Sequence, residues 1–253
     1  MNRDRRANLG ADHPCRNCDV SAKAVCNTLD ERRLADLRNR GCEINLRPEQ
    51  TLFHQGDRAD CVYSLTSGVV KLYADLPDGR RQVVAFHFPG EFIGFCAMPE
   101  YHCSAEAVSN ATLCRFRTDR FEQFAHEHPA LASSRQRRLS NDLVSAQKRA
   151  VLLGRATALE RLACFLVDVR HRSQPGSAHA PSTIQLPMRR ADIADYLGVT
   201  KETVSRELTA LRRAGIIRTR PGRQLEILDD ARFNRLAFGE PADDALPARL
   251  SAF

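Results

Sequence analysis

Residues 189–217 read RRADIADYLGVTKETVSRELTALRRAGII. The pattern predicts a helix, a tight turn at Gly198 and a second helix that begins after Thr200, a residue suited to helix capping. The apolar residues are Ile193, Ala194 and Leu197 in the first helix and Val204, Leu208 and Leu211 in the second. Their spacing places them on one inward face of each helix. The stretch therefore predicts a helix-turn-helix unit.

The opposite face of the second helix is polar. Glu202, Ser205, Arg206 and Thr209 fall at i, i+3, i+4 and i+7, so their side chains project together. Arg206 can donate two hydrogen bonds to guanine, Glu202 can accept one from cytosine, and Ser205 can serve either partner. The alternative interpretation is a solvated helix face with a Glu202–Arg206 ion pair.

Basic residues around this unit favour DNA as the partner. They are Arg189, Arg190, Lys201, Arg212, Arg213, Arg218, Arg220 and Arg223. We expect bases to be read by Glu202, Ser205 and Arg206, and the DNA backbone to be contacted by Arg189, Arg190, Lys201, Thr209 and Arg212. Residues 216–220 and 224–228, joined by a Pro-Gly turn, predict a two-stranded wing.

Length and composition agree with a soluble, two-domain chain. It has 253 residues, a hydrophobic fraction of 43% and a net charge of +7, which favours a polyanionic partner. No apolar run approaches the roughly 18 residues that span a bilayer, and the N-terminus lacks a signal-peptide core. We expect a cytoplasmic protein with no membrane partner. The absence of a nucleophile–base pair, a phosphate-binding glycine loop and a dinucleotide motif argues against an enzyme.

The chain contains nine cysteines, of which Cys15, Cys18 and Cys26 form a C-x2-C-x7-C cluster. In a reducing cytoplasm cysteines bind metal or serve as small buried apolar residues. The first pair can hold one metal from a single turn, although zinc knuckles and redox dithiols also use this spacing. Three thiolates need a fourth ligand, and four cysteines typically hold a cubane iron–sulfur cluster.

The middle of the chain predicts an antiparallel sandwich or roll between a short helix and a long one. The short helix is expected over 29–41. Short β-rich runs separated by glycine-containing turns follow at 43–46, 51–54, 61–66, 69–74, 82–88, 92–95, 105–108 and 111–117. The long helix is expected over 129–153 and a further helix over 157–172.

The long helix carries an apolar seam of the coiled-coil type. Its members are Leu139, Leu143, Ala146, Ala150 and Leu153. Basic and acidic flanks favour pairing with a second copy, and packing on the chain's own sheet is the alternative. Dimerisation would place two recognition helices about 34 Å apart, as a palindromic site requires. The expected domains are a cysteine-bearing arm (1–28), a sensory roll (29–128), a dimerisation helix (129–153), a DNA-binding domain (154–238) and a flexible tail (239–253).

Together these features resemble the CRP/FNR superfamily of bacterial transcription regulators over about residues 15–235. The cysteine cluster, the phrase HFPGEFIGF at 87–95 and ETVSR at 202–206 are similar to the FNR branch, whose members respond to oxygen through a [4Fe-4S] cluster. The resemblance implies an α+β fold: an N-terminal antiparallel β-roll, similar to cyclic-nucleotide-binding domains, then a long dimerisation helix and a C-terminal winged helix-turn-helix.

By this resemblance Cys15, Cys18, Cys26 and Cys114 would hold the cluster. The x7 gap differs from the shorter gap of the best-known member, and Cys114 rests on the match of one segment, SNATLCRFRTDRFEQF. Cys103 is the nearest competitor for the fourth position. The remaining cysteines, in apolar or strand contexts, are expected to be ordinary thiols, and they are Cys42, Cys61, Cys96 and Cys164.

The implied function is a homodimeric regulator that binds TTGAT and ATCAA half-sites and contacts RNA polymerase. Oxygen would remove the cluster and loosen the dimer seam, or else reorient the long helix. A cyclic-nucleotide receptor needs an arginine after the Gly90–Glu91 turn, but residues 92–113 contain neither arginine nor lysine. A haem sensor using His87 or His102 and a zinc-stabilised regulator remain alternatives, as does a redox iron–sulfur protein.

Overall fold

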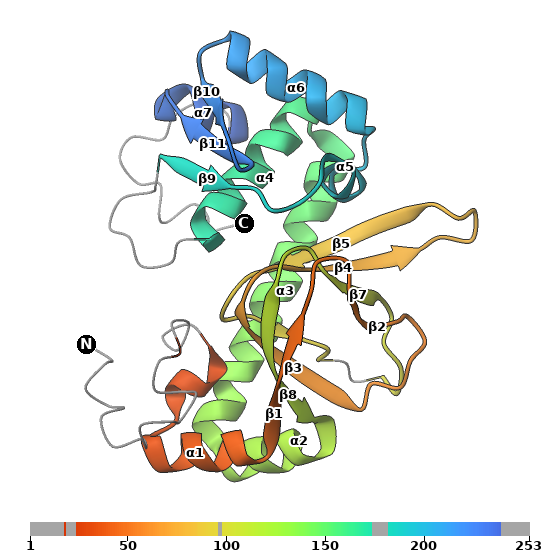
Figure 1. The fold of residues 1–253 in the computed structure, drawn as a ribbon, viewed down its shortest axis with the longest axis vertical. Coiled ribbons are helices and arrows are strands. Elements are labelled where there is room, and N and C mark those ends of the chain that lie inside the picture. The colour runs from red at the N-terminus through yellow and green to blue at the C-terminus, as the bar shows by residue number, and fades with distance from the viewer. Residues whose placement is uncertain (1–17, 19–23, 96–97, 174–181, 239–253) are drawn as a thin grey trace. The chain divides into compact units, whose positions relative to one another are not determined.

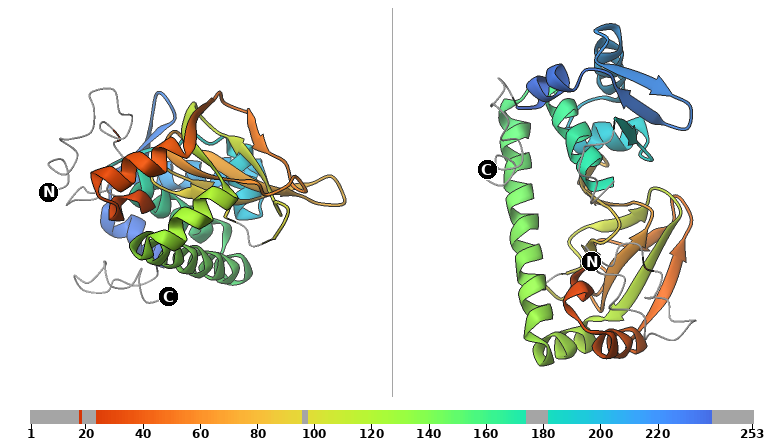
Figure 2. Two further views of the ribbon diagram at one scale, coloured as in Figure 1. Left: turned by 90° about the horizontal axis from the view of Figure 1, so that it is seen from below. Right: turned by 90° about the vertical axis from the view of Figure 1, so that its left-hand side faces the viewer.

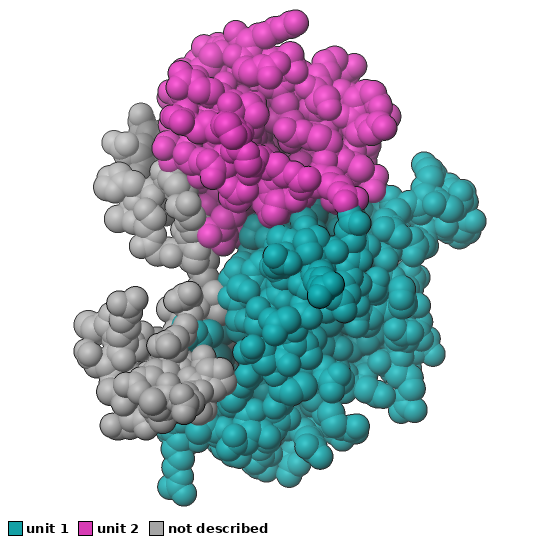
Figure 3. Space-filling view, in the orientation of Figure 1, with its two compact units in different colours: residues 1–140 teal, residues 141–253 magenta. Residues whose placement is uncertain are grey.

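The structure is a computed structural model that describes residues 18, 24–95, 98–173 and 182–238. The chain forms two compact units, residues 1–140 and 141–253 (Figure 3). The described helices include none that is both long and apolar enough to cross a membrane. The expected tail at 239–253 and most of the arm at 1–28 lie outside the described residues.

The first unit is built on two four-stranded antiparallel sheets, which confirms the predicted β-roll (Figure 1). One sheet has the order β1 (Gly41–Leu46), β8 (Ala111–Arg117), β3 (Cys61–Ser67) and β6 (Phe92–Ile93). The other has the order β2 (Thr51–Phe53), β7 (Ser104–Ala107), β4 (Val70–Asp75) and β5 (Arg81–His87). All eight predicted strands are present, and their ends lie within two residues of those predicted from sequence.

Two hydrophobic clusters stabilise this unit. The inner cluster lies between the sheets and includes Leu65, Val70 and Leu113, each fully buried. The second, here called the outer cluster, joins the roll to the helices around it. Its buried members are Leu37, Val62, Phe92, Phe116, Phe121, Phe124, Ala125 and Leu131.

Helices cover one end of the roll, where α1 and α2 lie side by side (Figure 2). Helix α1 (Glu31–Asn39) confirms the helix expected at 29–41, and the Asp30 side chain accepts a hydrogen bond from the Arg33 backbone N–H at 2.9 Å. Helix α2 (Thr118–Glu127) was not predicted; it directly follows β8 and begins without a side-chain cap. The long helix α3 spans Pro129–Arg155, as expected.

The second unit contains α4 (Ala158–Ser173), α5 (Arg190–Leu197), α6 (Lys201–Arg213) and α7 (Asp230–Phe238), together with a small sheet. Both strands of the predicted wing are present, and the sheet has a third strand that was not predicted. Strand β9 (Thr183–Gln185) pairs antiparallel with β11 (Gln224–Ile227), which also pairs with β10 (Ile217–Arg220). Strand β9 provides hydrogen-bond partners for the edge of β11 that would otherwise be unpaired, and it links the wing to the segment that precedes α5.

Two glycines with the same backbone conformation provide a test of packing in the roll. Gly68 (φ +81°) and Gly79 (φ +80°) both adopt the left-handed region, so alanine costs about 1 kcal/mol at either site. A Cβ at Gly68 would also lie 2.1 Å from the Asn110 carbonyl oxygen, whereas none of the described residues places a heavy atom within 4 Å of a Cβ at Gly79. We expect Gly68→Ala to lower the free energy of unfolding by about 1 to 3 kcal/mol more than Gly79→Ala. Equal urea midpoints and slopes for the two variants would contradict this account.

Candidate DNA interface and cysteine site

The predicted helix-turn-helix is formed by α5 and α6. Gly198 has φ +65° and ends α5, a left-handed conformation that glycine adopts without strain. The Thr200 hydroxyl accepts a hydrogen bond from the Thr203 backbone N–H at 3.2 Å and so caps α6. Every apolar residue expected on the inward faces is buried, namely Ile193, Ala194, Leu197, Val204, Leu208 and Leu211. This confirms the core of the unit.

The expected base-reading residues are exposed on the first turns of α6. The side chains of Glu202 and Arg206 are 69% and 71% exposed. Arg206 lies 3.4 Å from the Glu207 carboxylate, so the Glu202–Arg206 pair of the alternative interpretation does not form. The Ser205 hydroxyl donates to the Lys201 carbonyl at 2.9 Å, and it would exchange this bond for one to a base.

The expected backbone contacts differ in their exposure. Arg189, Lys201 and Arg212 are exposed, whereas Arg190 and Thr209 are half-buried. Burial, and then the nearby charge of Arg223, lower the pKa of Arg190. The Thr209 hydroxyl donates to the Ser205 carbonyl at 2.9 Å. The exposed cations are thus better placed to meet phosphates than Arg190 is.

The wing contributes cations that are already paired. Arg220 and Arg218 lie 2.9 Å and 3.5 Å from the same Glu226 carboxylate. The hydrogen bond from Arg220 lowers the pKa of Glu226, which therefore stays ionised at neutral pH. Phosphate would have to compete with this carboxylate for both guanidinium groups.

Of the four expected cluster ligands, two pack against the same hydrophobic cluster. Cys26, in the 3-10 helix η2 (Val25–Thr28), and Cys114, in β8, are both half-buried against the outer cluster. Cys18 is half-buried, and Cys15 lies outside the described residues. Across the part of the chain that the structure describes, no three His, Cys, Asp or Glu side chains come together as a metal site.

Arg38 contacts Cys114, a contact that was not predicted from the sequence. Its Nη1 donates a hydrogen bond to the Cys114 Sγ at 2.9 Å, and its Nη2 lies 3.3 Å from the Glu43 carboxylate. The Arg38 side chain is only 12% exposed, so it is held in this position. A guanidinium group stabilises negative charge on sulfur, whether as a free thiolate or as a metal ligand.

The remaining described cysteines have ordinary surroundings. Cys103 is buried, Cys61 packs against the inner cluster, and Cys42 is exposed. The Cys164 thiol donates to the Ala237 carbonyl at 2.8 Å, and burial raises its pKa to about 11. Cys96 lies outside the described residues.

The Gly90–Glu91 turn is engaged with the protein itself. One Glu91 oxygen lies 3.0 Å from an Arg138 nitrogen, and the other accepts from the Phe88 backbone N–H at 3.2 Å and lies 3.4 Å from His87 Nδ1. Because Nδ1 of His87 faces Glu91, a haem bound at His87 would have to use Nε2, whereas His102 is exposed. Glu91 thus ties the turn to α3 through Arg138.

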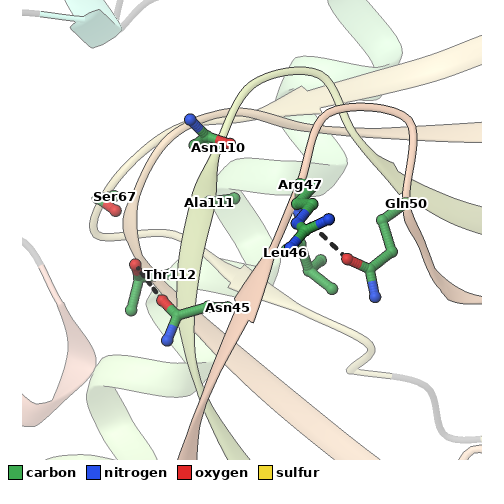
Figure 4. A pocket seen from close by; sticks show the side chains of 8 residues that line it. All are labelled: Asn45, Leu46, Arg47, Gln50, Ser67, Asn110, Ala111 and Thr112. Atoms are coloured by element: carbon green, nitrogen blue, oxygen red, sulfur yellow. Dashed lines mark hydrogen bonds between the residues drawn. The ribbon is translucent and has the colours of Figure 1, made fainter.

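A cavity of about 480 Å³ opens elsewhere on the roll (Figure 4). Polar side chains line most of it, including Asn45, Arg47, Gln50 and Thr112. Thr112 donates to Asn45 at 2.8 Å and the Arg47 backbone N–H donates to Gln50 at 3.1 Å, so these groups already bind one another. Glu91 is not part of its lining.

The predicted seam on α3 is mostly exposed in the single chain. Leu139 and Leu143 are 44% and 60% exposed, and Ala146 and Ala150 are also exposed. Leu153 differs, because it is half-buried and lies against Gly198. Val144 and Val151, which were not predicted, are exposed as well and widen the stripe. An apolar stripe of this kind marks a surface that a partner covers.

Comparisons with known proteins agree with this geometry. Residues 43–128 match the cyclic nucleotide-binding domain and residues 160–236 the Crp-like helix-turn-helix domain. The nitrogen fixation regulation protein FixK of Bradyrhizobium diazoefficiens is 39% identical over 89% of this chain and 94% of its own. The transcriptional activator protein FnrL of Cereibacter sphaeroides is 32% identical over 93% and 96%. The solved structure of FixK2 from Bradyrhizobium japonicum has a TM-score of 0.73 at 32% identity and covers 79% of this chain and 99% of that one.

A β-roll followed by a winged helix-turn-helix with an exposed polar recognition face defines a DNA-binding transcription regulator, not an enzyme. The chain belongs to the CRP/FNR family. Regulators of this family bind DNA and act as dimers, in agreement with the sequence-based expectation.

The assignment of Arg206 to base reading can be tested against Arg212, which is expected to contact phosphate. Arg206→Ala should weaken binding to the duplex that the wild type selects from a random pool by about 1 to 3 kcal/mol, and relax discrimination at one base pair. Arg212→Ala should weaken binding to all sequences alike. Fluorescence anisotropy on single-base variants of the duplex measures both. If Arg206→Ala loses affinity evenly across sequences, it contacts phosphate instead.

Proposed function

We propose that the chain is an oxygen-responsive transcription regulator that holds a [4Fe-4S] cluster on Cys15, Cys18, Cys26 and Cys114. The observation that carries the proposal is that Cys26 and Cys114, distant in sequence, both pack against one hydrophobic cluster. Four cysteine thiolates are the usual ligands of such a cluster, and the N-terminal cysteines supply the spacing for the other two positions.

Arg38 supports the proposal through charge. A cluster held by four thiolates carries net negative charge, and hydrogen bonds to its sulfur atoms help to set its reduction potential. The guanidinium of Arg38 donates such a bond to Cys114 from a position that is largely closed to water. When bound, the cluster would supply an oxygen-labile iron centre to this part of the protein.

The outer cluster offers a route from the cysteines to the dimer helix. It includes Phe121 and Phe124 of α2 and Leu131 in the first turn of α3. Cys26 and Cys114 pack against the same hydrophobic cluster. A bound iron–sulfur cluster would link the N-terminal segment to β8 and so restrict the packing of these aromatic side chains. Loss of the iron–sulfur cluster would remove this link, change the packing at the start of α3 and thereby alter the dimer seam.

The DNA target is proposed to be a palindrome read by Glu202, Ser205 and Arg206 of two chains, with contact to RNA polymerase. The exposed stripe on α3 supports pairing of two copies. Linking two half-sites raises the effective concentration of the second recognition helix, so a change at the seam alters affinity without any change in base contacts.

A second candidate is a CRP/FNR regulator that responds to a different signal, or one stabilised by zinc. A different signal is favoured by the position of Cys18, which does not join Cys26 and Cys114 in a three-ligand group among the described residues. Zinc would also be satisfied by thiolate ligands, but it would not make the protein sensitive to oxygen.

Anaerobic purification tests the proposed cofactor. The protein should be brown, with iron and acid-labile sulfide in near-equal amounts, and its visible absorption and operator affinity should fall after air is admitted. Zinc without sulfide would support the second candidate. A colourless sample whose DNA binding ignores oxygen would remove the sensor and leave the regulator. If the protein has the mass of a dimer both before and after exposure to air, oxygen does not dissociate the dimer, and reorientation of α3 is favoured instead.

The choice of Cys114 can be tested against Cys164, a cysteine of the second unit that is half-buried as Cys114 is. Cys114→Ala should abolish retention of iron and sulfide, because the fourth ligand is lost. Cys164→Ala should retain both, since its thiol only donates to the Ala237 carbonyl. Metal and sulfide analysis of the anaerobic variants measures the outcome. Retention in the first variant with loss in the second would overturn the ligand assignment.

A further inference from the structure

Two arginines cap the C-terminal end of α5, the helix that precedes the recognition helix. Arg149 of α3 donates from Nη2 to the Tyr196 carbonyl at 3.2 Å, and Arg161 of α4 donates from Nη1 to the Leu197 carbonyl at 3.0 Å. The last carbonyls of a helix lack partners within the helix and carry partial negative charge. A guanidinium group donates hydrogen bonds to these carbonyls and also offsets their partial negative charge.

Arg161 also binds two other segments. Its Nη2 donates to the Leu153 carbonyl, in the last turn of α3, at 2.8 Å, and its Nε donates to the Ala156 carbonyl, between α3 and α4, at 2.9 Å. One planar group therefore joins the end of α3, the connection to α4 and the end of α5. Lysine cannot reproduce this arrangement, because its donors radiate from a single nitrogen atom.

Arg149 adds a second tie through an aromatic ring. Its guanidinium carbon lies 4.2 Å from the centre of the Tyr196 ring, and that ring packs against Phe165 of α4 at 5.3 Å. A cation stacked on an aromatic face in a partly desolvated site stabilises the contact. Tyr196 is thus held from α3 and from α4 at the same time.

The capped end lies immediately before the recognition helix. Gly198 turns the chain, Thr200 caps α6, and Glu202 follows within the first turn. The direction in which α6 begins is therefore set by where α5 ends. We infer that Arg149 and Arg161 are positioning residues for DNA recognition, which fix the recognition helix to the end of the dimer helix and pass a change in α3 to the DNA-reading side chains.

The test compares Arg161→Met with Arg155→Met, which removes the same charge from an exposed position at the end of α3. The probe is the duplex that the wild type selects from a random pool, and every variant is compared with the wild type prepared under the same anaerobic conditions. Arg161→Met should lower the affinity about tenfold, since its three hydrogen bonds are lost together. Arg155→Met should bind as the wild type does, and the oligomer mass of both should be unchanged.

Salt dependence separates positioning from phosphate contact. If Arg161 touched DNA, its replacement would lower the slope of log K against log salt by about one, and lysine would restore binding. As a positioning residue it should leave the slope unchanged, and Arg161→Lys should not restore affinity. Hydrogen exchange should become faster in residues 190–213 and stay the same in α7.

Arg149→Met provides a milder variant should Arg161→Met unfold. It removes one hydrogen bond and the stacking on Tyr196. A several-fold loss of affinity with an unchanged salt slope supports the inference. Wild-type affinity in both folded variants, or a reduced slope in either, would overturn it.

Discussion

Burial of apolar side chains in the outer cluster is the constraint on which the first unit depends. Leu37 of α1, Val62 and Phe116 of the roll, Phe124 of α2 and Leu131 of α3 all become almost inaccessible to water there. Each such burial stabilises the fold by about 1.5 to 3 kcal/mol. Because these side chains come from three helices and two strands of the roll, the position of the first turn of α3 cannot change without disturbing the roll.

Sequence periodicity predicted the elements that contain a local signal. Strands alternating with glycine turns and the three-and-four spacing of Val204, Leu208 and Leu211 are short-range patterns, and the structure confirms both. Helix α2 was missed because it begins at Thr118 without a side-chain cap, directly after a strand. Strand β9 was missed because it follows the loop-like sequence SQPGSAHAPS at 173–182, and its stability depends on pairing with β11.

The candidate sites were predictable to different degrees. Exposure of Glu202 and Arg206 follows from helix geometry alone, and it is observed. The bond from Arg38 to Cys114 joins distant positions and leaves no trace in spacing. The acceptors of Arg161 are backbone carbonyls, whose identity is independent of the side chains that carry them. Such contacts can be found only once the chain is folded.

These contacts also change how the net charge of +7 should be understood. Many arginines act inside the protein: Arg170 is buried against Asp230, Arg161 caps carbonyls, and Arg138 binds Glu91. Arg218 and Arg220 share Glu226. The net charge already subtracts these carboxylates, whereas the charge of Arg161, which binds carbonyl groups inside the protein, is counted in full. In the second unit the exposed cations expected to meet DNA include Arg189, just before α5, and Lys201, Arg206 and Arg212 on α6, so the geometry of the recognition helix as well as its charge decides which duplex fits.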